Sequence, residues 1–168
     1  MSQEKPTLAE TLNFSADDLT ANRQGRLSEA QKQRLLRGWR RTLWIVITLV
    51  ILFGLIATIL IFVGQRNASP ILTVIGVIVT IINATIVGLA AQSYLRTSSD
   101  IGAGRITTID GVVSHTIRVS GRAATYVLKV DAQEIVVPKL VFFAVEDRKS
   151  YRFYRAPASK TLLAAEPE

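Results

Sequence analysis

Cysteine is absent from this chain, and histidine occurs once, at position 115. Without cysteine there can be no disulfide framework, thiol nucleophile or thiolate metal site. No second histidine and no carboxylate cluster accompanies His115, so we interpret it as a strand residue without a catalytic role. The sequence also lacks a P-loop, a complete dinucleotide fingerprint and a nucleophile elbow. We therefore expect no enzyme activity, no cofactor and no bound metal.

Charge is absent from two long apolar runs. The first, Leu43–Gly64, has 22 residues, and the second, Ile71–Leu95, follows a six-residue connection that ends in Ser69-Pro70. A helix rises about 1.5 Å per residue, so the first run would extend about 33 Å and cross a bilayer core of about 30 Å. We expect a transmembrane hairpin over 43–95. No apolar stretch precedes it, so we expect no cleavable signal peptide.

Basic residues gather at one end of this hairpin. The connecting loop holds only Arg66, whereas six cations lie in residues 26–41: Arg26, Lys32, Arg34, Arg37, Arg40 and Arg41. The positive-inside rule then places both termini on the cytoplasmic side of the plasma membrane, the inner membrane of a bacterial cell. Trp39, Trp44 and Tyr94 would lie at that interface. The cations would also attract anionic lipid headgroups.

Small residues recur at every fourth position of the second run: Gly76, Thr80, Ala84 and Gly88, with Asn83 beside them. Small side chains let membrane helices approach closely, so these five residues form the predicted helix-packing face. Gly54, Ala57 and Thr58 are the matching residues of the first run, and a second protein could also pack there. We interpret Asn83 as an interhelical hydrogen-bonding residue, with a transport or ligand role as the alternative.

The residues before the hairpin divide into two parts. Residues 1–14 predict a disordered tail, and residues 15–42 predict a helical pair. Ser15 suits the N-cap and Gly25 the C′ position of a two-turn helix, and Ser28 begins a capping box with Gln31. The second helix should run directly into the first span.

This pair resembles the SHOCT-type helical pair of bacterial membrane-associated proteins. The likeness rests on Leu19, Gly25, Leu27, Ser28 and Leu35-Leu36. It implies protein–protein contact or oligomerisation. The alternative is an amphipathic helix that lies on the lipid headgroups.

After the hairpin, residues 96–104 are small and polar, and we expect a linker. Residues 105–168 then predict a small cytoplasmic all-β domain of SH3-like or OB-like barrel type. Its expected strands cover 105–120, 125–130, 134–137, 150–155 and 161–164, with a turn at Gly121-Arg122. A short helix is expected over 138–145, with Val141, Phe142 and Phe143 in the core.

One stretch of this domain mixes basic and aromatic residues and is a possible binding surface: Arg148, Lys149, Tyr151, Arg152, Tyr154 and Arg155. On an OB-like surface such a mixture suits single-stranded nucleic acid. We favour a membrane or protein partner over nucleic acid, because orientation in a membrane already accounts for the N-terminal cations.

Over residues 43–165 the plan resembles uncharacterised bacterial two-span membrane proteins with a small β-barrel tail, in outline the NfeD-type proteins. That resemblance implies a barrel-type tail and no particular reaction. We expect a non-enzymatic accessory or scaffold subunit of a membrane assembly, as a homo-oligomer or with another membrane protein. The alternative is a membrane-anchored regulatory or ligand-sensing module that binds through its β domain.

Overall fold

The computed structural model of the protein describes residues 7–121 and 123–168, which fold as two compact units. The hairpin unit comprises residues 33–98. The flank unit comprises the chain on both sides of it, up to Lys32 and from Ser99 onward. The N-terminal helices and the β domain, which we expected as separate domains, therefore form a single folded body.

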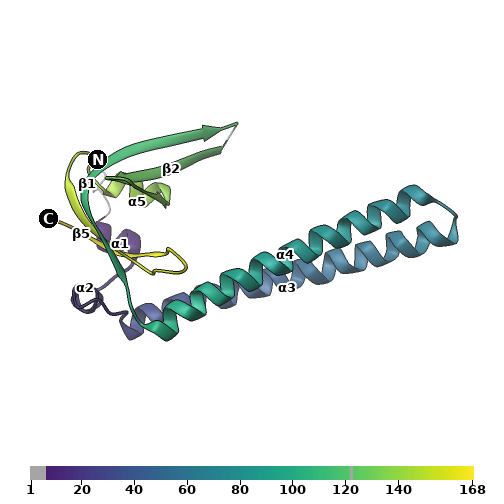
Figure 1. Ribbon diagram of the computed structural model, residues 1–168, viewed down its shortest axis with the longest axis horizontal. Coiled ribbons are helices and arrows are strands. Elements are labelled where there is room, and N and C mark those ends of the chain that lie inside the picture. The colour runs from purple at the N-terminus through teal and green to yellow at the C-terminus, as the bar shows by residue number, and fades with distance from the viewer. Residues whose placement is uncertain (1–6, 122) are drawn as a thin grey trace, which may run out of the picture. The chain divides into compact units, whose positions relative to one another are not determined.

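The hairpin unit consists of two long antiparallel helices, α3 (Glu29–Arg66) and α4 (Pro70–Ala103) (Figure 1). Both are long and apolar enough to cross a membrane, and only 6% of the most apolar 18-residue window of each is buried. As predicted, α3 continues from the capping box into the apolar run, and α4 begins at Pro70. Proline suits this first helical position because the missing N–H would have no partner there.

The two helices meet along a seam of alternating three- and four-residue spacing. The less exposed positions on α3 include residues 43, 46, 50, 53, 57, 60 and 64, and on α4 residues 72, 76, 79, 83, 86 and 90. This is the heptad spacing of helices that pack as a coiled coil. The seam uses one stripe of each helix, and the remaining apolar side chains face outward.

The flank unit contains a five-stranded antiparallel sheet with strand order β3-β2-β1-β4-β5. Its strands are β1 (Thr107–Ser120), β2 (Ala123–Val130), β3 (Gln133–Val137), β4 (Ser150–Arg155) and β5 (Leu162–Pro167). The small β domain is confirmed, but the sheet is open, with β3 and β5 at its edges, and the expected closed barrel is not formed. The turn predicted at Gly121-Arg122 includes Arg122, which lies outside the described residues.

Strand β1 serves both halves of this sheet. Its residues 107–112 pair with β4, and its residues 113–120 pair with β2. Gly111 lies at the change of partner with φ +153°, and a Cβ there would come within 2.7 Å of Asp131 Oδ2. Only glycine accepts both the dihedral angle and the close approach. The bend at Gly111 lets one strand enclose a shared core.

The core of the flank unit lies inside this bent sheet. Val113, Leu128 and Phe153 are fully buried there, and helix α5 (Lys139–Ala144) adds Val141 and Phe142. The short helix expected over 138–145 is thus confirmed.

Part of the expected disordered tail is helical. Residues 1–6 lie outside the described residues, but helix α1 (Leu8–Leu12) follows a capping box between Thr7 and Glu10. Leu8 and Leu12, one turn apart, pack against the core of the β domain. Burial of this pair offsets the cost of ordering a short polar segment.

The second predicted helix is confirmed as α2 (Ala16–Arg23), with Ser15 as its N-cap. Its Ser15–Asp18 capping box has both reciprocal hydrogen bonds, and Gly25 follows with φ +76°. The Asp18 carboxylate, which is buried, also accepts a hydrogen bond from the Ser28 hydroxyl. One carboxylate thus caps α2 and fixes the residue before α3.

The expected linker over 96–104 is wrong, because these residues form the last turns of α4. Asp100 is buried at 1% exposure, and its carboxylate accepts hydrogen bonds from the backbone N–H groups of Ala158 and Ser159, both at 2.7 Å. The helix ends at Ala103, and Gly104 follows with φ +61°. Small polar residues can adopt helical conformation, and the two hydrogen bonds to Asp100 stabilise these last turns of α4.

Candidate functional site

The two flanks of the hairpin are joined immediately beside α3 and α4. The Leu27 N–H donates to the Gly104 carbonyl at 2.9 Å, and the Ile106 N–H donates to the Gly25 carbonyl at 3.2 Å. Arg26 and Arg105 form the isolated antiparallel bridge between these two bonds. The chain therefore enters and leaves the hairpin as a pair of hydrogen-bonded segments.

A second link joins α2 to the last strand. Arg23 donates to the Glu166 carboxylate, with its Nε 3.2 Å from Oε1, and the Tyr154 hydroxyl donates to the same Oε1 at 2.6 Å. The hydrogen bonds from Arg23 lower the pKa of Glu166. Burial, followed by the contact with Glu166, raises the pKa of Tyr154. This trio is an electrostatic clamp that holds α2 against β5.

Within the hairpin unit, Asn83 is hydrogen-bonded across the seam. Its side-chain Nδ2 donates to the Val50 carbonyl at 3.2 Å. This is the interhelical contact that the sequence predicted. The Oδ1 atom of Asn83 is buried and accepts no hydrogen bond from the described residues.

The predicted packing face is divided between the seam and the outer surface of the hairpin unit. Gly76 lies against α3, where an added Cβ would come within 3.1 Å of the Ala57 carbonyl oxygen, and Gly54 faces Asn83. Thr80, Ala84 and Gly88 are exposed instead. The reason is geometric, because each four-residue step on a helix of 3.6 residues per turn rotates by about 40°, so the stripe leaves the seam after Gly76.

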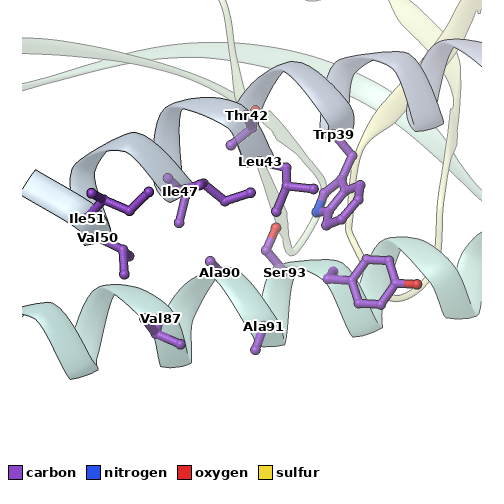
Figure 2. A pocket seen from close by; sticks show the side chains of 12 residues that line it. Trp39, Thr42, Leu43, Ile47, Val50, Ile51, Val87, Ala90, Ala91 and Ser93 are labelled. Atoms are coloured by element: carbon purple, nitrogen blue, oxygen red, sulfur yellow. The ribbon is translucent and has the colours of Figure 1, made fainter.

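An apolar groove of about 490 Å³ opens between α3 and α4 near Trp39 and Tyr94 (Figure 2). The rings of Trp39 and Tyr94 lie 4.5 Å apart between centroids, so the two aromatics share one level of the hairpin. Ala90 and Ala91 supply the α4 wall, where their short side chains leave the space open. The sequence reasoning missed this groove, although the Ala90-Ala91 pair opposite larger residues was a usable signal.

The basic and aromatic stretch does not form one surface. Tyr151 and Tyr154 are buried at 4% and 1% exposure, on opposite faces of β4. Arg152 pairs with Asp110 and Glu168, with nitrogen–oxygen distances of 2.8 and 2.7 Å. The rest of the predicted set is placed separately: Lys149 pairs with Glu146, Arg148 is exposed, and the Nε atom of Arg155 is buried.

A polar cavity of about 220 Å³ lies beside this strand and is lined by Arg23, Thr108, Asp110, Arg152 and Tyr154. Both arginines already pair with carboxylates, of Glu166 for Arg23 and of Asp110 and Glu168 for Arg152. The two cations therefore face three carboxylates, so the cavity offers no excess positive charge to an anionic ligand.

A patch of exposed apolar side chains extends from α5 along β1 and β2, and we call it the tip patch. Phe143, expected in the core, is 50% exposed, and its ring lies 6.0 Å from that of Tyr126. Tyr126 is paired with Ile117 across the sheet. The exposed residues of the patch are Ile117, Val119, Leu140 and Phe143, and the half-buried Tyr126 connects Ile117 with Phe143. Alternation of apolar residues beyond Val113 was the signal for it in the sequence.

His115 lies inside the flank unit rather than in a site. Its ring packs 4.2 Å from that of Phe142, and its backbone N–H donates to Asp147 Oδ1 at 2.9 Å. Over residues 7–121 and 123–168, no group of three or more histidines and carboxylates could hold a metal ion.

Comparisons of the chain with protein-family models, curated proteins and solved structures found no match.

Proposed function

We propose that this protein is a non-enzymatic accessory or scaffold subunit of a membrane assembly. Helices α3 and α4 anchor it in the plasma membrane, and the flank unit presents a docking surface in the cytoplasm. We also propose that the chain is related to two-span proteins with an SH3-like or OB-like tail, and that its N-terminal helices are of the SHOCT type.

The outward-facing apolar surface of the hairpin unit supports the membrane anchor. Trp44, Leu55, Ile59, Phe62 and Ile71 are each 58–70% exposed, although water would strongly disfavour them. Lipid covers such a surface without cost. Within the seam, the side-chain Nδ2 of Asn83 donates to the facing helix, so this N–H group is not exposed to lipid.

The joined flanks support a common side for both ends of the hairpin. Hydrogen bonds between Leu27 and Gly104, and between Ile106 and Gly25, require these segments to lie in the same compartment. The arginines near the start of α3 favour the cytoplasm by the positive-inside rule. Two independent arguments, one from folding and one from charge, therefore support the same topology.

The tip patch is the observation that carries the scaffold role. Val119, Leu140 and Phe143 are 73%, 65% and 50% exposed, beside Ile117 at 51%. Contiguous apolar patches are uncommon on monomeric surfaces and mark protein contacts. We propose that a partner protein, or a second copy of the chain, covers this patch.

Native mass measurement after gentle detergent extraction tests this role. The wild-type chain should retain a partner or a second copy, and Val119→Asp should release it. Val136→Asp is the matched control, because Val136 is 69% exposed on the opposite face of the same sheet. A monomeric wild-type chain that retains nothing would contradict the scaffold role.

Ligand sensing is the second candidate, and the polar cavity beside Arg152 is the observation that favours it. Its carboxylates suit a small polar or cationic ligand. Thermal-shift screening of the full chain against such compounds tests the idea, with Thr108→Val as the cavity variant. A ligand that stabilises the wild type and the variant equally would exclude this cavity as its site.

A further inference from the structure

We propose that the groove between α3 and α4 holds an acyl chain of an anionic phospholipid whose phosphate is bound by Arg40. This inference rests on the membrane location proposed above. It adds a ligand class, a site and a residue that selects the headgroup.

The walls of the groove suit hydrocarbon. Val46, Ile47 and Val50 line it from α3, and Ala90 and Ala91 line it from α4. The Ala90 side chain points toward α3 (Figure 2). No charged side chain lines it, and the hydroxyls of Thr42 and Ser93 lie toward the end that Trp39 and Tyr94 close. An acyl chain in the groove would supply the van der Waals contacts that the small alanine side chains do not make.

The charge at that end of the hairpin selects an anionic headgroup. Residues 33–98 contain six arginines and no lysine, aspartate or glutamate. Arg66 lies at the connecting loop, whereas the other five lie at the end that holds Trp39 and Tyr94: Arg34, Arg37, Arg40, Arg41 and Arg96. Tryptophan and tyrosine favour the depth of the lipid headgroups, which is also where arginine meets phosphate.

Arg40 is aligned with the groove. It precedes Ile47 by seven residues, so the two side chains lie on the same face of α3 about 10 Å apart along the axis. Ile47 lines the groove, and Arg40 is exposed. A lipid with its phosphate at Arg40 would therefore lay the middle of one acyl chain against Ile47. Arg41, one residue on, points about 100° away.

A second copy of the chain is the less suitable occupant. Inserted in the same direction, it would bring its own Arg37, Arg40, Arg41 and Arg96 to the same depth as those of the first copy. Like charges at close range oppose that contact. An anionic lipid brings the complementary charge instead.

The two tryptophans of the chain permit a direct test. Trp39 lines the groove, and Trp44 is 68% exposed outside its lining. The full-length chain with Trp44→Phe, or with Trp39→Phe, is reconstituted into phosphatidylcholine vesicles that contain phosphatidylglycerol. Bromine on the acyl chains of one lipid or the other then quenches only tryptophans in contact with that lipid.

The result expected is about a five-fold preference of the Trp39 site for phosphatidylglycerol, since one arginine at the surface contributes about that factor. Quenching of Trp44 should follow the bulk composition more closely. Arg40→Gln and Ala91→Leu should each remove the preference at Trp39. Arg66→Gln and Ala84→Leu, matched changes away from the groove, should keep it.

Three results would overturn the inference. Trp39 quenching in proportion to bulk composition would show that no lipid is selected. A Trp39 shielded from both lipids, with Trp44 quenched normally, would show that a protein segment or a second copy fills the groove. If neither tryptophan were quenched, the hairpin would lie outside the bilayer, and the proposed membrane location would fail as well.

Discussion

The backbone N–H of Leu27 donates to the carbonyl oxygen of Gly104 at 2.9 Å, across 76 intervening residues that include the whole hairpin. This bond makes the flank unit a closed body, from which α3 departs and to which α4 returns. Any membrane crossing by one helix must therefore be reversed by the other. The two flanks therefore form a single folded body.

The seam between α3 and α4 should tolerate a methyl group at Gly88 but not at Gly76. A Cβ at Gly76 would lie 2.6 Å from Ile61 Cγ1 and 3.1 Å from the Ala57 carbonyl oxygen, whereas a Cβ at Gly88 would meet nothing within 4 Å. Gly76→Ala should cost about 1–3 kcal/mol of overpacking. Gly88→Ala should be neutral or stabilising, because alanine is the better helix former. Unfolding in mixed micelles measures both, and equal stability of the two variants would contradict the seam.

The hydrogen bond from Asn83 to the Val50 carbonyl should contribute modestly to stability. Interhelical bonds of this kind average about 0.6 kcal/mol in a bilayer, so Asn83→Leu should lose roughly that amount. Thr85→Val is the control, because the Thr85 hydroxyl donates only within its own helix, to Ile81. Unfolding in mixed micelles compares the two. A loss no greater than that of the control would show that the Asn83 bond does not hold the helices together.

Asp100 should stabilise the flank unit more than the exposed Asp17 does. Its buried carboxylate accepts two backbone hydrogen bonds at 2.7 Å, from Ala158 and Ser159. Bonds to a charged acceptor contribute about 1.5–3 kcal/mol each, so Asp100→Ala should cost roughly 3 kcal/mol. Amide hydrogen exchange at residues 158 and 159 should accelerate in parallel. Asp17→Ala, at an exposed first-turn position of α2, should change neither measurement by more than about 1 kcal/mol.

Acid should weaken the clamp between α2 and β5. Hydrogen bonds from Arg23 lower the pKa of Glu166 in the folded chain, so its contribution to stability is fully present above the ordinary glutamate pKa of about 4.3. That contribution is lost as the pH falls through the lowered value. Glu166→Gln should reduce the free energy of unfolding at neutral pH. It should also make the fall in that free energy toward acid pH, the acid limb, less steep. Arg23→Gln should have the same two effects, and an acid limb unchanged in both variants would contradict the clamp.

Much of the fold could be predicted because its signals are local. The caps at Ser15 and Ser28, the start of α4 at Pro70 and the apolar runs each depend on residues within a few positions. The strands were also predicted within a few residues, since turn residues separate them. The errors occurred where distant contacts decide the structure: Leu8 and Leu12 become helical against the β core, and Asp100 keeps residues 96–103 helical.

The candidate sites were harder to predict, for geometric reasons. Gly76 and Asn83 reach the seam, but the stripe through Thr80, Ala84 and Gly88 rotates away from it, because a four-residue repeat does not match the helix period. Tyr151 and Tyr154 looked like binding residues by composition, yet strand alternation buries them on two faces. The groove exists because the side chains of the facing helix are small, and the tip patch is exposed because no other element covers it. Both depend on packing between elements, which the sequence of one strand or helix does not reveal.

A disulfide between the two flanks tests most directly whether they form one folded body. Arg26 and Arg105 form an antiparallel bridge of the non-hydrogen-bonded kind, in which the Cα atoms lie about 4.5 Å apart, within the range of a disulfide. The chain has no cysteine, so Arg26→Cys with Arg105→Cys can form one intramolecular bond only. Oxidation of this full-length variant in isolated membranes should close that bond within each chain, whereas either single cysteine variant should form no bond within a chain. Two cysteines that stay reduced, or that an impermeant maleimide labels from opposite sides of the membrane, would contradict the account.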